Sequence, residues 1–166
     1  MFETTAQILS RTDLAAFVEK ARGREAKVVL ANGCFDVLHV GHIRYLMGAK
    51  ALGDVLIVGI NSDEQVKRLK GNGRPFQDQN DRAELIAALS AVDAVTIFEE
   101  PTVEELIRII RPDIHAKGTD YTEDSVPERA AVIAIGGRVA IVGDPKDHSS
   151  TELIARIGSG SGKAGQ

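Results

Sequence analysis

A short apolar run, a glycine-containing turn and a helix follow one another near the start of the chain, and this order constrains the fold more than any other feature. Residues 28–31 (VVLA) form an apolar run typical of a buried strand, and residues 43–52 carry apolar side chains at helical spacing. The stretch between them, residues 32–42 (NGCFDVLHVGH), is therefore predicted to be a strand-to-helix turn. Gly33 is expected to relax this turn, because glycine tolerates backbone angles that other residues avoid.

Strand-like and helix-like segments then alternate along the chain. Asp81 with Glu84, and Thr102 with Glu105, have the spacing of capping boxes that would begin two of the helices. Such alternation is typical of a parallel sheet with right-handed crossovers. The predicted fold class is α/β, with a Rossmann-like, doubly wound, five-stranded parallel sheet. Strands are predicted at residues 28–31, 54–60, 94–98, 113–117 and 138–142, and helices at residues 12–22, 43–52, 63–69, 81–91, 102–110, 127–135 and 149–157.

Length and composition are those of one ordinary domain. Of the 166 residues, 43% are hydrophobic and 27% are charged, proportions that are usual for globular proteins. We therefore predict a single domain over residues 1–157, with a disordered tail over residues 158–166, where glycine and serine dominate.

Charge and cysteine content argue against several classes of protein. The formal net charge of −4 gives no reason to expect nucleic acid or an anionic membrane as a partner. Cys34 is the only cysteine, so no internal disulfide is possible and a reducing compartment is consistent. The first residues lack the basic and apolar segments of a signal peptide, and no apolar run is long enough to span a bilayer. These observations predict a cytoplasmic protein.

The turn carries two histidines at the start of the predicted helix. Gly41 is expected to leave the first backbone N–H groups of the helix uncovered, and such groups attract phosphate. His39 and His42 flank Gly41 and, at this spacing, both imidazoles can reach the same anion. A metal pair would need a third ligand, and only Cys34 and Asp36 are near enough in sequence to supply one. The phosphate interpretation is therefore favoured.

The string NGCFD-x-LHxGHxxYL, at residues 32–46, resembles the HxGH signature of the nucleotidyltransferase superfamily. The resemblance implies transfer of a nucleoside monophosphate from a triphosphate to a phosphate or carboxylate acceptor. Such an acceptor is already anionic, so catalysis needs positioning and electrostatic stabilisation of an in-line displacement rather than a strong base.

The resemblance extends over about residues 8–157, through stretches such as GDVLIVGINSDEQVKRLKGNGRP, RPDIHAKGTDY and SSTELI. Together these are similar to the adenylyltransferase half of ADP-heptose synthases. The resemblance implies transfer of AMP from ATP to D-glycero-D-manno-heptose 1-phosphate, giving ADP-heptose, a precursor of lipopolysaccharide or surface glycan, and pyrophosphate. It also implies a homodimer, and a separate heptose kinase in the same pathway.

Site residues follow from the resemblance position by position. Mg²⁺ or a similar divalent cation is expected to accompany ATP, with no ligands for it indicated. Catalytic roles are implied for His39, His42, Lys70 and Arg82. Nucleotide or phosphate contacts are implied for Asn32, Gly33, Cys34, Phe35, Asp36, Gly41, Lys117, Gly118, Asp120, Ser149, Ser150 and Thr151. Substrate contacts are implied for Asn61, Asp63, Arg74 and Tyr121.

Several of these residues also have simpler interpretations. Arg74 and Arg82 can fork onto phosphate oxygens, or lie solvated on a loop and a helix face. Asp36 can orient the turn or hold a metal through water. Cys34 has no evident base partner and is interpreted as a small buried residue rather than a nucleophile. The serines before Thr151 can cap the last helix while neighbouring groups bind phosphate.

Two other functions remain open. A CTP-dependent cytidylyltransferase acting on glycerol 3-phosphate or a related phosphorylated alcohol would share the fold, although the tryptophan of the HWGH variant is missing. A catalytically silent nucleotide-binding domain is the second alternative. Thr119, where glycine is usual, and the pair Asp147 and His148 depart from the family pattern and leave base and acceptor choice open.

Overall fold

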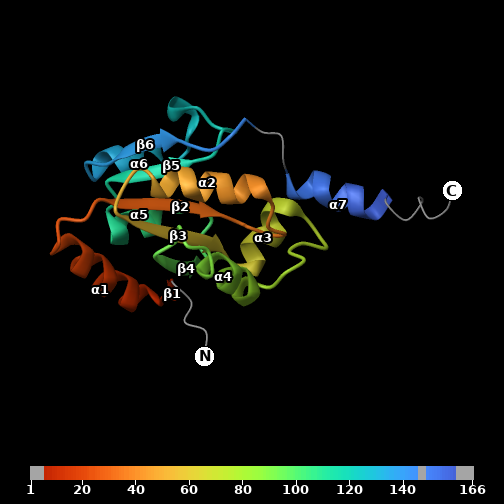
Figure 1. The fold of residues 1–166 in the computed structure, drawn as a ribbon, viewed down its shortest axis with the longest axis horizontal. Coiled ribbons are helices and arrows are strands. Elements are labelled where there is room, and N and C mark those ends of the chain that lie inside the picture. Colours follow the sequence, from red (N-terminus) through yellow and green to blue (C-terminus); the bar gives the residue numbers. More distant parts are fainter. Residues whose placement is uncertain (1–5, 146–148, 160–166) are drawn as a thin grey trace.

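A six-stranded, all-parallel sheet forms the middle layer of the computed structural model, which describes residues 6–145 and 149–159 (Figure 1). The order of the strands is β1-β4-β3-β2-β5-β6. Their bounds are Gln7–Ile8 for β1, Val28–Gly33 for β2, Val55–Asn61 for β3, Ala94–Phe98 for β4, Ile114–Lys117 for β5 and Arg138–Ile141 for β6.

Helices cover both faces of the sheet. Alternate residues of β2 divide between two cores: Val29 and Ala31 pack with α2 and α4, whereas Val28 and Leu30 pack with α1, α5 and α6. The helices are α1 (Arg11–Arg22), α2 (Val40–Lys50), α3 (Asp63–Lys70), α4 (Gln79–Ala87), α5 (Glu104–Ile110), α6 (Arg129–Ala134) and α7 (Ser150–Ser159), with a short 3-10 turn at Glu123–Ser125.

The predicted α/β class and the doubly wound parallel sheet are confirmed, but the number of strands was one too low. The additional strand, β1, has only 2 residues and pairs with β4 at the edge of the sheet. A strand this short contains no alternation that a sequence pattern could reveal.

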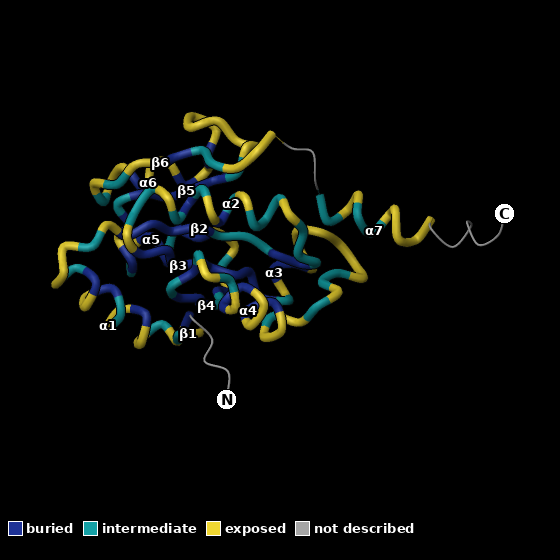
Figure 2. The backbone as a smooth tube through the Cα atoms, viewed as in Figure 1, coloured by how far each residue is buried: buried dark blue, intermediate teal, exposed yellow. Residues whose placement is uncertain are grey.

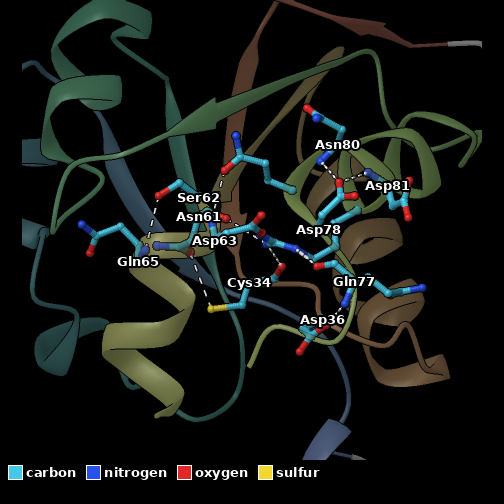
Figure 3. Close-up of polar contacts among 12 residues, drawn as sticks. Cys34, Asp36, Asn61, Ser62, Asp63, Gln65, Gln77, Asp78, Asn80 and Asp81 are labelled. Atoms are coloured by element: carbon cyan, nitrogen blue, oxygen red, sulfur yellow. Dashed lines mark hydrogen bonds and ion pairs between the residues drawn. The ribbon is translucent and has the colours of Figure 1, made fainter. Parts of the chain in front are cut away.

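Both predicted capping boxes were wrong. The side chain of Asp78, not that of Asp81, caps α4, since it accepts from the backbone N–H groups of Asn80 and Asp81 (Figure 3). At α5 the capping position is Val103, which forms no side-chain cap. The predicted disordered tail also began too early, because α7 continues to Ser159; residues 160–166 lie outside the described part of the chain.

The connection order reverses between β2 and β5, which are neighbours in the middle of the sheet. From β2 the chain continues through β3 to β4 on one side, and β5 and β6 lie on the other. In sheets of this kind ligands bind beyond the carboxyl ends of the strands at this reversal. None of the helices in the described ranges is long and apolar enough to cross a membrane.

Candidate active site

A cavity of about 670 Å³ opens at the carboxyl edge of the sheet. This volume is within the usual range for small-molecule sites. The turn after β2, the ends of β3 and β4, the loops after β5 and β6 and the start of α7 all contribute to its wall. Of the predicted site residues it is lined by Asn32, Gly33, Cys34, Phe35, Asp36, His39, Gly41, His42, Asn61, Lys70, Arg74, Lys117, Gly118, Asp120, Tyr121, Ser149, Ser150 and Thr151, but not by Asp63 or Arg82.

In the turn after β2, two residues other than glycine adopt a left-handed backbone conformation. Phe35 has a φ of 49° and Val37 a φ of 61°, values that are unusual for bulky or β-branched residues and tend to cluster at functional sites. Gly33 has no positive φ; a Cβ atom there would lie 3.1 Å from the Phe35 ring. The expectation that Gly33 relaxes the turn was therefore wrong, and its role is to let this ring pack close to the backbone.

His39 and His42 cap the start of α2 with their own ring nitrogens. The backbone N–H of Gly41 donates to Nδ1 of His39 at 3.1 Å, and the backbone N–H of His39 donates to Nδ1 of His42 at 3.3 Å. The rings stack with centroids 3.8 Å apart. Because both Nδ1 atoms accept, the neutral rings carry their proton on Nε2. The sequence suggested that the Gly41 N–H is uncovered, but this group is bonded to His39. Both histidines line the cavity, and Nε2–H is the donor that each neutral ring has.

His42 is neutral at physiological pH. Burial, followed by electrostatic repulsion from His39 and Lys70, lowers the pKa of His42 to about 4. A ring of this kind can donate a hydrogen bond from Nε2 without gaining or losing a proton.

Asp36 ties the turn to the loop between α3 and α4. Its buried carboxylate accepts from Nε of Arg74 at 2.6 Å and from the backbone N–H groups of Phe76 and Gln77 at 3.0 and 3.1 Å. Burial alone would raise the pKa of Asp36, but the Arg74 guanidinium and the two N–H groups outweigh it and hold that pKa below its ordinary value. Arg74 is therefore a fixed cation in the cavity wall, and the interpretation of Arg74 as a solvated loop residue was wrong.

Arg82 does not lie in the cavity wall, and its position does not suit the predicted contact with phosphate. Its side chain is fully buried and donates to the backbone oxygens of Gln77, Cys34 and Asn61, while Nη2 pairs with Asp63 at 2.7 Å. The guanidinium therefore connects α4 to the ends of β2 and β3. The alternative, a solvated helix face, also disagrees with this burial.

The residues after β3 divide between the cavity and the structure behind it. Asn61 lines the cavity, and its Oδ1 lies 3.9 Å from Sγ of Cys34 (Figure 3). Ser62 caps α3 by accepting from the backbone N–H of Gln65 at 3.3 Å. Burial raises the pKa of the Cys34 thiol, which nearby cations only partly oppose. This direction argues against a thiolate nucleophile and agrees with the interpretation of Cys34 as a packing residue.

The KGTDY stretch, which begins with the last residue of β5, forms another part of the cavity wall. Nζ of Lys117 lies 4.7 Å from the centre of the Tyr121 ring and 3.8 Å from Oε2 of Glu128. Burial lowers the pKa of Lys117, and the Glu128 carboxylate opposes that shift. Thr119, the departure from the family pattern, donates from Oγ1 to the backbone oxygen of Asp144 at 2.7 Å and so joins this wall to the loop after β6.

The start of α7 completes the cavity, while the rest of that helix extends away from the domain (Figures 1 and 2). Oγ of Ser149 accepts from the backbone N–H of Glu152 at 3.0 Å, as a helix cap does. Oγ of Ser150 donates to the backbone oxygen of Val37 at 3.2 Å and thereby docks the helix on the turn. The pair Asp147 and His148 lies outside the described residues.

Sequence reasoning missed Glu128, Tyr45 and His115. Glu128 and Tyr45 line the cavity, and His115 supports Asn32 from behind its wall. Tyr45 belongs to the motif used for the resemblance, so its position could have marked it. Nothing in the sequence around Glu128 or His115 distinguishes either of them from an ordinary helix or strand residue.

Metal-binding groups are not concentrated at this site. Within the ranges that the structure describes, no group of three or more His, Cys, Asp or Glu side chains could hold a metal ion. Mg²⁺ is commonly held by substrate phosphates with only one or two carboxylates, so the donor set here suits a cation carried by the triphosphate better than one held by the protein alone.

Known proteins resemble this chain at the level of family, sequence and fold. The cytidylyltransferase-like family model matches residues 30–156. The bifunctional protein HldE of Pelobacter propionicus is 44% identical over 155 residues, which cover 93% of this chain and 32% of that protein. HldE of Bradyrhizobium sp. is 48% identical over 147 residues, covering 89% of this chain and 30% of that protein. The chain thus spans about a third of the length of these curated relatives.

A solved structure has a similar fold. The crystal structure of the lipopolysaccharide core biosynthesis protein from Thermoplasma volcanium superposes with a TM-score of 0.63 at 31% sequence identity. The match covers 73% of this chain and 99% of that one.

Proposed function

This chain belongs to the cytidylyltransferase-like family of nucleotidyltransferases, and on that premise we propose that it transfers AMP from ATP to D-glycero-D-manno-heptose 1-phosphate, giving ADP-heptose and pyrophosphate. The motifs shared with the adenylyltransferase half of ADP-heptose synthases support this choice of substrates. The similarity to HldE proteins supports it too, and we propose that this chain corresponds to their nucleotidyl-transferring part.

The proposed reaction is one in-line displacement. A phosphate oxygen of the sugar 1-phosphate attacks the α-phosphorus of ATP and forms the new P–O bond. The bond from the α-phosphorus to the bridging oxygen breaks, and its electron pair leaves with pyrophosphate. Since the acceptor oxygen is already anionic, the protein has to hold like charges together rather than remove a proton.

The arrangement of His39 and His42 is the single observation that carries the proposal. Each ring accepts a backbone N–H at Nδ1, which gives each neutral ring an N–H donor at Nε2 in the wall of the cavity. Donors fixed in this way stabilise charge as it develops on the leaving pyrophosphate without reorganising during the reaction.

Three cations supply the remaining positive charge in the wall. Lys70 at the end of α3, Arg74 on the following loop and Lys117 at the end of β5 all line the cavity, and each can pair with phosphate oxygens. Arg74 is held in place by Asp36, whereas Lys70 is exposed at the end of α3. In this proposal Arg82 does not touch substrate and acts through the turn and Asn61. Mg²⁺ entering with ATP would neutralise part of the triphosphate charge.

Pyrophosphate release tests the proposal directly. ATP and CTP are each offered with heptose 1-phosphate and with glycerol 3-phosphate, in the presence of Mg²⁺, and His42→Ala serves as the matched control for enzyme-dependent release. We expect pyrophosphate release only from the pair of ATP and heptose 1-phosphate. A preference for CTP or for glycerol 3-phosphate would overturn the substrate assignment while retaining the nucleotidyl transfer.

A silent binding domain predicts a different result. Nucleotide would then bind, as measured by calorimetry, with no pyrophosphate released from any pair of substrates. The acceptor itself requires a kinase that phosphorylates the sugar, and we propose that the transfer reaction takes place in the cytoplasm. The homodimer implied by the resemblance stays a prediction, which light scattering on the purified protein would test.

A further inference from the structure

His115 holds the side chain of a cavity residue from behind the wall. It lies on β5, is fully buried, and places Nε2 2.9 Å from Oδ1 of Asn32. The paired register of β2 with β5 ends at Leu30 and His115, so Asn32 lies where the two strands separate. Alternation along β2 puts Asn32 on the same face of the sheet as Leu30. The hydrogen bond therefore bridges the floor of the crevice at the reversal of strand order.

A second bridge fixes the backbone of Asn32. The hydroxyl of Tyr45 donates to the backbone oxygen of Ala116 at 2.7 Å and accepts from the backbone N–H of Asn32 at 3.4 Å. With its backbone N–H bonded to Tyr45 and its Oδ1 to His115, Asn32 has its side-chain NH₂ group left for the cavity that it lines.

The position of the proton on His115 determines which end of the Asn32 amide faces the ligand. Nδ1 of His115 is buried and, within the described ranges, has no hydrogen-bond partner. A proton on Nδ1 would create a buried orphan N–H, which is rarer in proteins than an unpaired acceptor. The proton therefore belongs on Nε2, which donates to Oδ1. Burial, followed by the charge of Lys117, lowers the pKa of His115 to about 3, so the ring stays neutral.

We propose that His115 is a positioning residue that orients the Asn32 amide, so that its NH₂ group donates to an oxygen acceptor of the bound nucleotide. The proposal rests on the proposed function in taking a nucleotide as the ligand. Without the donor at His115, the amide can turn over and present Oδ1, which would repel an anionic oxygen.

Kinetics of four variants test this coupling. His115→Leu replaces the donor by an apolar side chain. We expect kcat/KM to fall by about tenfold or more, because the Asn32 amide loses its orientation. His115→Gln, whose Nε2–H can replace the ring N–H, should keep kcat/KM within about threefold of wild type. Asn32→Ala should match His115→Leu, and the double variant should be no worse than Asn32→Ala, because both changes remove the same interaction.

Val139→Ala is the matched control for lost packing. Val139 is the register partner of His115 on β6, is buried and does not line the cavity. We expect this variant to lower the thermal midpoint and leave kcat/KM unchanged. Additive effects of the two site substitutions, or equal losses in His115→Leu and His115→Gln, would overturn the proposal.

The tautomer can be measured without any substrate. Nitrogen-15 NMR of the wild-type protein should show the His115 proton on Nε2, and a proton on Nδ1 would overturn the inference. If no pair of substrates is turned over, the proposed function fails. The role of His115 is then tested by comparing the same variants in equilibrium binding of ATP and of tripolyphosphate. Weaker binding of both probes places the acceptor oxygen on the phosphate chain, and weaker binding of ATP alone places it on the nucleoside. Unchanged binding in His115→Leu, or a wild-type protein that binds neither probe, overturns the proposal.

Discussion

His39 serves the fold and the proposed chemistry with different atoms of one ring. Nδ1 caps α2 by accepting from the backbone N–H of Gly41, and Nε2 is the donor proposed for the triphosphate. His39→Ala removes both roles. We expect it to lower kcat by about 100- to 1000-fold, the usual effect of losing one charge-stabilising donor, and to lower the free energy of unfolding by about 1 kcal/mol through the lost cap.

His39→Asn separates the two roles. The Asn side chain is a strong cap residue and can accept from the same backbone N–H, but it does not extend as far as Nε2 of the ring. We therefore expect wild-type stability in urea denaturation together with the same loss of kcat as in His39→Ala. Wild-type turnover in folded His39→Asn would remove Nε2 from the mechanism.

Buried His115 predicts a pH dependence of stability. Its pKa is lowered from 6.5 to about 3 in the folded protein, so between these values the unfolded chain binds a proton that the folded chain does not. The contribution of neutral His115 to the free energy of unfolding is therefore fully present above pH 6.5 and is lost as the pH falls toward 3. We expect wild type to lose up to about 1.4 kcal/mol per pH unit more than His115→Leu in this range. Urea denaturation at several pH values measures both slopes, and parallel profiles would show that His115 does not titrate on unfolding.

At the scale of elements, Arg82 joins three of them. Its guanidinium donates from α4 to backbone oxygens at Cys34, after β2, and at Asn61, at the end of β3. Arg82→Met keeps most of the side-chain volume and removes the donors. Because several buried carbonyl groups lose their partner, we expect the free energy of unfolding to fall by about 2–4 kcal/mol.

Thermal stability and kinetics together identify the role of Arg82. If it acts by positioning, the loss of activity in Arg82→Met should accompany the loss of stability, and Asp63→Asn, which weakens only the partly exposed ion pair, should show little of either. A folded Arg82→Met protein with unchanged stability and a kcat lowered by about 100-fold would support the original prediction that Arg82 grips phosphate.

The sequence predicted the elements of this fold better than their ends. A strand such as β3 is easy to predict, because it is buried on both faces and its sequence is therefore a continuous apolar run. The start of α4 was missed because Asp78 and Asp81 are both suitable caps, and only the tertiary position of the chain selects between them. The HxGH turn could be located from sequence, whereas the burial of Arg82 and the contact of His115 with Asn32 depend on segments that are distant along the chain.

At the scale of the whole molecule, the cavity is assembled from the domain and from one helix that hardly packs against it. Among the described residues of α7 none is buried, and Figure 2 shows this helix extending from the domain. The first turn of this helix and the preceding Ser149 nevertheless supply Ser149, Ser150 and Thr151 to the cavity. The stability of the domain and the completeness of the site should therefore depend on different parts of the chain.

A chain ending at Pro145 tests this separation. Removing an element with no buried residue should change the free energy of unfolding by less than about 1 kcal/mol, as surface changes usually do. Turnover should nevertheless fall by at least about 100-fold, because the hydroxyl and N–H donors of the first turn of α7 are lost. Ser150→Ala with Thr151→Ala in the full chain is the matched control: it keeps the helix and the Ser149 cap, and should lose turnover with little change in stability. A truncated chain that unfolds would show that α7 contributes to the core, and one that retains turnover would remove Ser150 and Thr151 from the site.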